Sequence, residues 1–386
     1  MGSILILWLL NPTIKSPDGL EMLRLTEQWL GQPARVGDPN FWPPLWSALN
    51  IPGVMLGESI IAAHLLNQLM WGAVIWPLHL MVCCLADRTA ANRSIILYLA
   101  LPMLISFGPI LDARPLGTLI TTSFVAAIVR QATRGTGLGF VGFFAALAPF
   151  ARPEGVLFPL LAGAAAWLLG QGRLRSLLMT VVALIPNVLF RSNFRGMTGH
   201  EQLFGPWYDS WATWDMLALF GPAAAPTKFR EFALQAVELG VVDGQPQLRD
   251  FVGALVMAPS GIVGAVLIVA GATGILGLIL AGRGLRSVLP HRNRWWTLGL
   301  VLFTPVVIGA APMSKDQAGP LSNYLFLMPS IIMLVAVGLG TIPKMWPKWV
   351  PTLLMVLILG EAHHTPLQSP TPYFLEGSDA AKLATV

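Results

Sequence analysis

Residues 16–49 read SPDGLEMLRLTEQWLGQPARVGDPNFWPPLWSAL and separate two apolar runs of the chain. Asp18 stands at the start of a helical pattern in which Glu21, Arg24 and Gln28 would share one polar face. The stretch ends in PPLW, directly before the next long apolar run. This order predicts an interfacial helix in a polar loop between two membrane-spanning helices.

The composition of the chain requires a membrane as its solvent. Hydrophobic residues make up 55% of the 386 residues and charged residues only 11%, whereas soluble domains carry about 25% charged residues. A water-exposed surface needs more charge than this chain has. The 38 glycines and 31 prolines fit the same interpretation, because both are commoner in membrane helices than in soluble ones. We expect one all-α integral membrane domain over residues 1–386.

The apolar runs give the number and limits of the spans. A spanning helix needs about 20 apolar residues. By this criterion the sequence predicts a bundle of about eleven spans, at 2–14, 58–84, 94–111, 115–133, 136–151, 154–170, 175–192, 259–282, 295–312, 320–341 and 346–362. The first is short, and it lacks the basic region and cleavage site of a signal peptide. Two long outer segments separate the spans, at 11–57 and 192–258.

The basic residues indicate which ends of the spans face the cytoplasm. With a cytoplasmic N-terminus, every short inner loop is basic, as the positive-inside rule requires, and Asp87 is the one carboxylate among the 19 Asp and Glu residues that falls inside. We therefore predict a cytoplasmic N-terminus and an acidic outer face. The membrane is most simply a bacterial inner (plasma) membrane.

The second outer segment, 192–258, contains an amphipathic pattern at residues 228–240, which predicts a helix lying on the bilayer surface. A cluster of aromatic residues precedes it, at Trp207, Tyr208, Trp211 and Trp214. These side chains fit two roles, which are anchoring at the membrane interface and stacking on a sugar ring.

Two further segments follow the acidic first loop along the chain and carry motifs of their own. Residues 151–155 read ARPEG at an outer helix end, and residues 321–329 read LSNYLFLMP. Together with the acidic first loop and its PPL-type end, they resemble the GT-C glycosyltransferases, which include protein O-mannosyltransferase-like and aminoarabinose-transferase-like groups. ARPEG resembles the family's "aRpeg" segment, and LSNYLFLMP resembles its late "RYllpllP" segment, with Asn323 where Arg is usual. The resemblance covers most of the chain through short motifs.

The resemblance implies a membrane enzyme that uses a polyprenyl-phosphate-linked sugar and an outer-face acceptor, which is a glycan, a lipid or a protein. Asp18 matches the acidic residue at the family's reacting centre and would take the proton of the acceptor. Glu21 on the same helix, and Asp112 in the second outer loop, complete the candidate catalytic set. The alternative for Asp18 is a helix cap. For Asp112 and Arg114 the alternative is a pair at a helix boundary.

The leaving phosphate needs cationic donors, because negative charge develops there during transfer. Candidates on the outer face are Arg152, Arg114, Lys315 and Arg195, with Arg191 nearby. The candidate substrate contacts are Glu154, Trp46, Tyr324 and Trp207. The alternative for Arg152 and Glu154 is a local ion pair at the interface, which contributes little in water.

Several features argue against other functions and qualify this one. The outer loops hold no DxD motif, so the one cofactor considered, a divalent metal, has no support from a motif. Asp18-Gly19 replaces the Asp-Glu doublet of the mannosyltransferase group. A catalytically silent GT-C-like scaffold, or a subunit that binds or moves a lipid-linked substrate, therefore remains the alternative. Charges at the outer edges disfavour a secondary transporter, and scattered basic residues disfavour a nucleic-acid partner.

Overall fold

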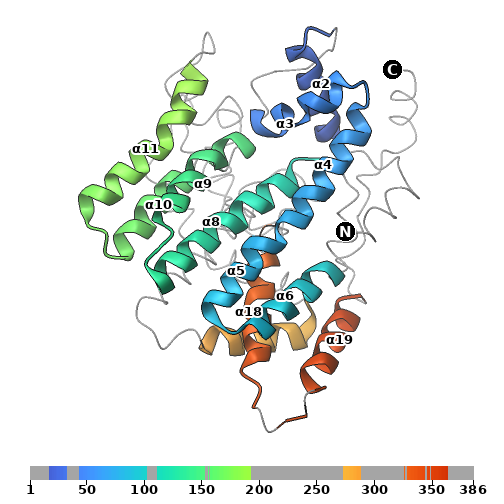
Figure 1. Cartoon of the computed structure of the whole chain (residues 1–386), viewed down its shortest axis with the longest axis vertical. Helices are drawn as coiled ribbons and strands as arrows, with labels where there is room; N and C mark the ends of the chain where they lie inside the picture. Colours follow the sequence, from blue (N-terminus) through green and yellow to red (C-terminus); the bar gives the residue numbers. More distant parts are fainter. Residues whose placement is uncertain are drawn as a thin grey trace, which may run out of the picture.

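The computed structural model describes residues 17–32, 43–101, 111–152, 155, 157–192, 273–287, 326, 328–343, 346–347 and 349–363. Over this part of the chain the predicted all-α class is confirmed, and the helices pack into one bundle (Figure 1). The predicted spans at 2–14 and 295–312 and the amphipathic helix at 228–240 lie outside the described residues.

Most of the helices coincide with predicted apolar runs, whereas α2 and α3 lie in the predicted outer loop. They are α2 (Pro17–Trp29), α3 (Pro44–Met55), α4 (Ser59–Ala73), α5 (Ile75–Leu85), α6 (Arg88–Ala100), α8 (Arg114–Arg134), α9 (Leu138–Ala151), α10 (Leu157–Leu168), α11 (Arg173–Ser192), a helix over residues 273–287, α18 (Met328–Gly340) and α19 (Val350–His363). Helices α4 and α5 are joined through Val74 and together form one apolar stretch, Ser59–Leu85, of 27 residues.

Helix α6 starts earlier than the sequence predicts. We expected a span over residues 94–111, because Arg88 and Arg93 look like loop residues, but α6 ends at Ala100 and Leu101 is extended. In the structure the helix begins at Arg88, since the carboxylate of Asp87 accepts a hydrogen bond from the backbone N–H of Ala90 at 2.7 Å. Asp87, the one acidic residue predicted to face inward, is therefore a helix cap.

Helix α8 is the centre of the bundle and lies between α4, α5 and α9 (Figure 1). Nearly all of its residues from Pro115 to Val129 are buried, and Phe124 meets Phe158 of α10 edge to face at 4.8 Å. Its interior face also carries the hydroxyl residues Thr118, Thr121, Thr122 and Ser123. At 1.5 Å per residue, the helix is about 30 Å long, the thickness of the hydrocarbon core.

Helix α11 is largely exposed, in contrast to the buried α8, and lies at the edge of the bundle (Figure 1). Its surface is covered with exposed apolar side chains, which include Leu174, Leu177, Leu178, Val182 and Leu189. Ser59–Leu85 and Arg173–Phe190 are the two stretches among the described residues that are long and apolar enough to cross a membrane. Exposed leucines along a helix are the pattern expected of a surface that lipid rather than water solvates.

Helices α2 and α3 form one unit at the end of the bundle where α4 begins (Figure 1). The hydroxyl of Thr26 donates to the carbonyl of Ser47 at 3.0 Å, and the hydroxyl of Ser47 donates to the carbonyl of Met22 at 2.9 Å. Both hydroxyl side chains are fully buried. These crossed hydrogen bonds fix the position of α2 relative to α3.

Two glycines bring the helix over residues 273–287 close to α18. A Cβ at Gly284 would lie 2.0 Å from the carbonyl oxygen of Leu334, and a Cβ at Gly338 would lie 2.0 Å from that of Leu280. Small residues at such crossings let two membrane helices approach until their backbones touch.

We expect Gly338→Ala to destabilise the protein by about 1–3 kcal/mol, because the added methyl group would overpack a backbone-to-backbone contact. Thermal unfolding of the purified full chain in detergent measures this change. Gly139→Ala is the matched control, since a Cβ at Gly139 meets nothing within 4 Å. Equal melting temperatures for the two variants would contradict the close crossing.

Candidate functional site

The turn before α8 holds a buried pair of opposite charges. Oδ1 of Asp112 accepts a hydrogen bond from the backbone N–H of Arg114 at 2.7 Å, and Oδ2 forms an ion pair with the Arg114 guanidinium. The side chains are only 7% and 17% exposed. A carboxylate that turns back on the chain two residues later is a common way to begin a helix. The predicted pair at a helix boundary is therefore present.

Near this pair, two buried polar atoms have no hydrogen-bond partner among the described residues. Nε of Arg114 is buried and has no hydrogen-bond partner among the described residues. The hydroxyl of Thr118, one helical turn further on, is also buried without a partner in that part of the chain. Because residues four apart share a face of a helix, these two residues start from the same side of α8. Such groups suit a polar or anionic ligand.

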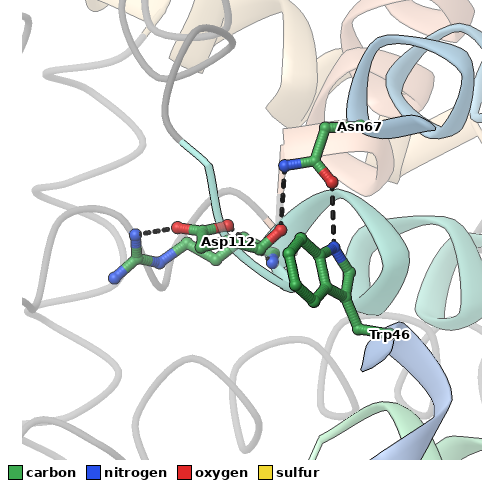
Figure 2. A network of polar contacts seen from close by, with 4 residues as sticks. Trp46, Asn67 and Asp112 are labelled. Atoms are coloured by element: carbon green, nitrogen blue, oxygen red, sulfur yellow. Dashed lines mark hydrogen bonds and ion pairs between the residues drawn. The ribbon is translucent and has the colours of Figure 1, made fainter. Parts of the chain in front are cut away.

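A hydrogen-bonded chain connects this turn to α3 and α4 (Figure 2). The indole N–H of Trp46 donates to Oδ1 of Asn67 at 2.9 Å. Nδ2 of Asn67 donates to the backbone carbonyl of Asp112 at 3.0 Å. Trp46 and Asn67 are fully buried. The position of the turn is therefore set by two helices from an earlier part of the sequence.

The first turn of α2 lies against the same turn. A Cβ at Gly19 would lie 1.9 Å from the carbonyl oxygen of Leu111 and 2.7 Å from its carbonyl carbon. Only glycine allows this approach. Asp18 directly precedes Gly19 and is the second residue of α2. The backbone of Asp18 is therefore next to the turn that carries Asp112, although its side chain is outside the described residues.

Arg152 joins the site from the end of α9. A Cβ at Gly117, three residues after Arg114 on α8, would meet Cδ of Arg152 at 2.6 Å and Cε1 of Phe326 at 2.7 Å. The guanidinium carbon of Arg152 lies 4.8 Å from the centre of the Phe326 ring, a distance typical of a cation–π contact. The ARPEG segment and the late LSNYLFLMP segment are thus in contact beside α8.

The predicted site residues divide into three groups. The segments that carry Asp18, Asp112, Arg114 and Arg152 come together at one end of α8, and Glu21 is partly buried on α2 three residues after Asp18. The remaining candidates, Glu154, Lys315, Arg195, Tyr324 and Trp207, lie outside the described residues. Trp46 is placed, but its fully buried indole is bonded to Asn67, which favours a supporting role over the predicted contact with substrate.

Two residues of this region were not among the predicted ones. Phe326 contacts Arg152, whereas the sequence directed attention to Tyr324, two residues earlier. Asn67 had a detectable signal, because His64, Asn67 and Gln68 place three polar side chains on one face of an apolar span. Among the described residues, no three His, Cys, Asp or Glu side chains are close enough to hold a metal ion.

Solved structures share this arrangement of helices. The oligosaccharyltransferase AglB from Archaeoglobus fulgidus, in complex with an inhibitory peptide and a dolichol-phosphate, matches 93% of this chain with a TM-score of 0.54 and 14% sequence identity. This chain has the GT-C fold. The same oligosaccharyltransferase in complex with zinc and sulfate matches 92% of the chain with a TM-score of 0.54 and 16% identity.

The chain spans about half the length of the oligosaccharyltransferase, at 52% and 48% of the two matched chains. ArnT from Cupriavidus metallidurans in the apo state also matches, over 87% of this chain and 75% of its own, with 13% identity and a TM-score of 0.38. No protein-family model matches the sequence, and no curated protein sequence gives a significant match. The relationship is thus one of fold.

Proposed function

We propose that this GT-C chain is a glycosyltransferase that moves a sugar from a polyprenyl-phosphate donor to an acceptor on the outer side of the membrane. The observation that carries the proposal is the meeting of the α2 start with the Asp112–Arg114 pair beside Arg152. Carboxylates and guanidinium groups at one end of a membrane bundle suit transfer from a lipid phosphate. A dolichol-phosphate and a peptide are bound in the related AglB structure.

In the proposed reaction Asp18 is the general base. Its carboxylate takes the proton from the acceptor, and the acceptor atom then attacks the anomeric carbon of the sugar. The bond between that carbon and the phosphate oxygen breaks, and its electron pair leaves with the polyprenyl phosphate. Arg114 and Arg152 would stabilise the negative charge that collects on this phosphate. Asp112 would hold Arg114 in place for this purpose.

The two ends of α8 support the proposed orientation. Arg114 begins the helix at the candidate site, and Arg134 ends it about 30 Å away. The Arg134 guanidinium reaches the carbonyl of Cys83, at the end of α5, at 3.5 Å. By the positive-inside rule this basic end would face the cytoplasm. The candidate site would then face outward, where lipid-linked sugars are used.

The direct test is sugar transfer by the purified full chain in lipid nanodiscs. We expect radiolabel to pass from a polyprenyl-phosphate sugar to an acceptor preparation, with no transfer from the corresponding nucleotide sugar. A set of donors that differ in their sugar would identify the substrate. Binding of polyprenyl phosphate without transfer from any donor would contradict the enzyme and favour the silent scaffold or lipid-binding subunit.

A further inference from the structure

Asn67 is a polar side chain in the middle of an apolar span, and it is fully buried. A primary amide in such a place is costly unless protein groups satisfy it, because the hydrocarbon of the bilayer offers no hydrogen bonds. The amide oxygen of Asn67 accepts a hydrogen bond from the indole N–H of Trp46 at 2.9 Å, and its amide nitrogen donates one to the Asp112 carbonyl at 3.0 Å. It therefore links α3, α4 and the turn before α8 through one side chain (Figure 2).

This link closes a ring of contacts around the candidate site. On one side, Gly19 of α2 lies directly against Leu111. On the other side, α2 is bonded to α3 through the hydroxyls of Thr26 and Ser47, and α3 reaches the turn through Trp46 and Asn67. Two independent routes thus connect the backbone of Asp18 with that of Asp112. A ring of this kind fixes the position of the Asp112 turn relative to the start of α2 better than either route alone.

We infer that Asn67 is a positioning residue, which holds the Asp112–Arg114 turn at one fixed place relative to the start of α2. This inference rests on the proposed transferase function of the site. Asn67 contacts the backbone of Asp112, so it acts on the carboxylate and the guanidinium through the turn. A leucine of similar size at position 67 would leave the indole N–H of Trp46 and the carbonyl of Asp112 buried without these partners.

The exchange of backbone amide hydrogens reports on this role without any substrate. The N–H of Arg114 is held by Oδ1 of Asp112, so it should exchange slowly in the wild-type chain. We expect Asn67→Leu to raise exchange in the peptide that covers residues 111–116, because the turn loses its hold on α4. The control is Tyr98→Phe. The Tyr98 hydroxyl of α6 donates a buried hydrogen bond of 3.0 Å to the carbonyl of Trp71, which lies on α4 like Asn67. Its removal also takes a hydrogen bond from α4 but leaves the turn untouched.

Steady-state transfer kinetics on the full chain provide the second measurement. A misplaced catalytic group slows the chemical step more than it weakens donor binding. We therefore expect Asn67→Leu to lower kcat on the order of tenfold and to change the KM for the donor by less than about threefold. Tyr98→Phe should keep both values close to those of the wild type.

Trp46→Phe makes the inference testable even if Asn67→Leu folds poorly. This change removes the donor to Asn67 and keeps the bond from Asn67 to Asp112, so a smaller rise in exchange and a smaller fall in kcat are expected. In the double variant the two effects should not add, because both residues act through one chain of hydrogen bonds. Additive effects would show that Trp46 and Asn67 act separately, and would overturn the network.

The two measurements separate failure of this inference from failure of the proposed function. Unchanged exchange at residues 111–116 in Asn67→Leu overturns the positioning role, whatever the transfer assay shows. A loosened turn with wild-type kcat overturns it as well, because the position of the turn would then not matter for transfer. A wild-type chain that transfers no sugar counts against the proposed function alone, since hydrogen exchange still decides what Asn67 holds in place.

Discussion

Asp18→Asn is expected to lower kcat for sugar transfer by about 10²–10⁴-fold, the usual contribution of a general base. The asparagine has the same shape as the aspartate, but its amide does not accept the acceptor's proton at neutral pH. Binding of polyprenyl phosphate should stay close to that of the wild type, because the arginines remain. Transfer and phosphate binding by purified protein measure both quantities.

A helix-stabilising role for Asp18 predicts a different outcome. Loss of one negative charge in the first turn of α2 costs only about 0.3–1 kcal/mol, so the melting temperature should fall slightly and transfer should persist. Glu27→Gln serves as the control, since it removes a carboxylate from the other end of the same helix. Full transfer by Asp18→Asn would remove Asp18 as the base.

The second large effect is expected at Gly19. A methyl group there would lie 1.9 Å from the carbonyl oxygen of Leu111, a backbone atom that no change of rotamer can move. Helix α2 must therefore shift away from the Asp112 turn. Displacement of a catalytic group by about 1 Å can cost about 10²-fold in rate. We expect Gly19→Ala to lose transfer to that extent, although Asp18 itself is unchanged.

Gly139→Ala is the appropriate comparison for this variant, because it adds the same methyl group to a glycine with nothing within 4 Å. Transfer by Gly139→Ala should match the wild type. The melting temperature should fall for Gly19→Ala, since overpacking costs about 1–3 kcal/mol. Normal transfer by Gly19→Ala would show that the contact between α2 and the turn is not required.

The sequence predicted the helical elements well because membrane spans have a strong local signal. The run from Ser59 to Leu85 and the existence of helix α8 were predicted from hydropathy. The start of α6 was missed, since the two arginines of its first turns resemble a loop and the cap at Asp87 is a single polar contact. End positions depend on such contacts, which hydropathy does not record.

The candidate site was predictable in its segments but not in its contacts. Asp112 and Arg114 are two residues apart, so a pair between them could be expected from the sequence. The approach of Gly19 to Leu111 and the bond from Asn67 to Asp112 join segments far apart in the chain. Such pairings follow from the packing of whole helices and leave no periodic pattern. For the same reason the contact of Phe326 with Arg152 was not predicted.

The ring that contains Asn67 also has a consequence for the order of biosynthesis. Asn67 and its partner Asp112 are 45 residues apart, so the amide nitrogen of Asn67 gains its Asp112 acceptor only after the turn before α8 has been made. Proteins generally fold from the N-terminus during synthesis. The contact between α2 and the Asp112 turn can thus form while the ribosome is still making α9, whereas the Arg152–Phe326 contact must wait for the last third of the chain. A newly made chain would bring α2 and the Asp112–Arg114 turn together first and add the Arg152–Phe326 contact last.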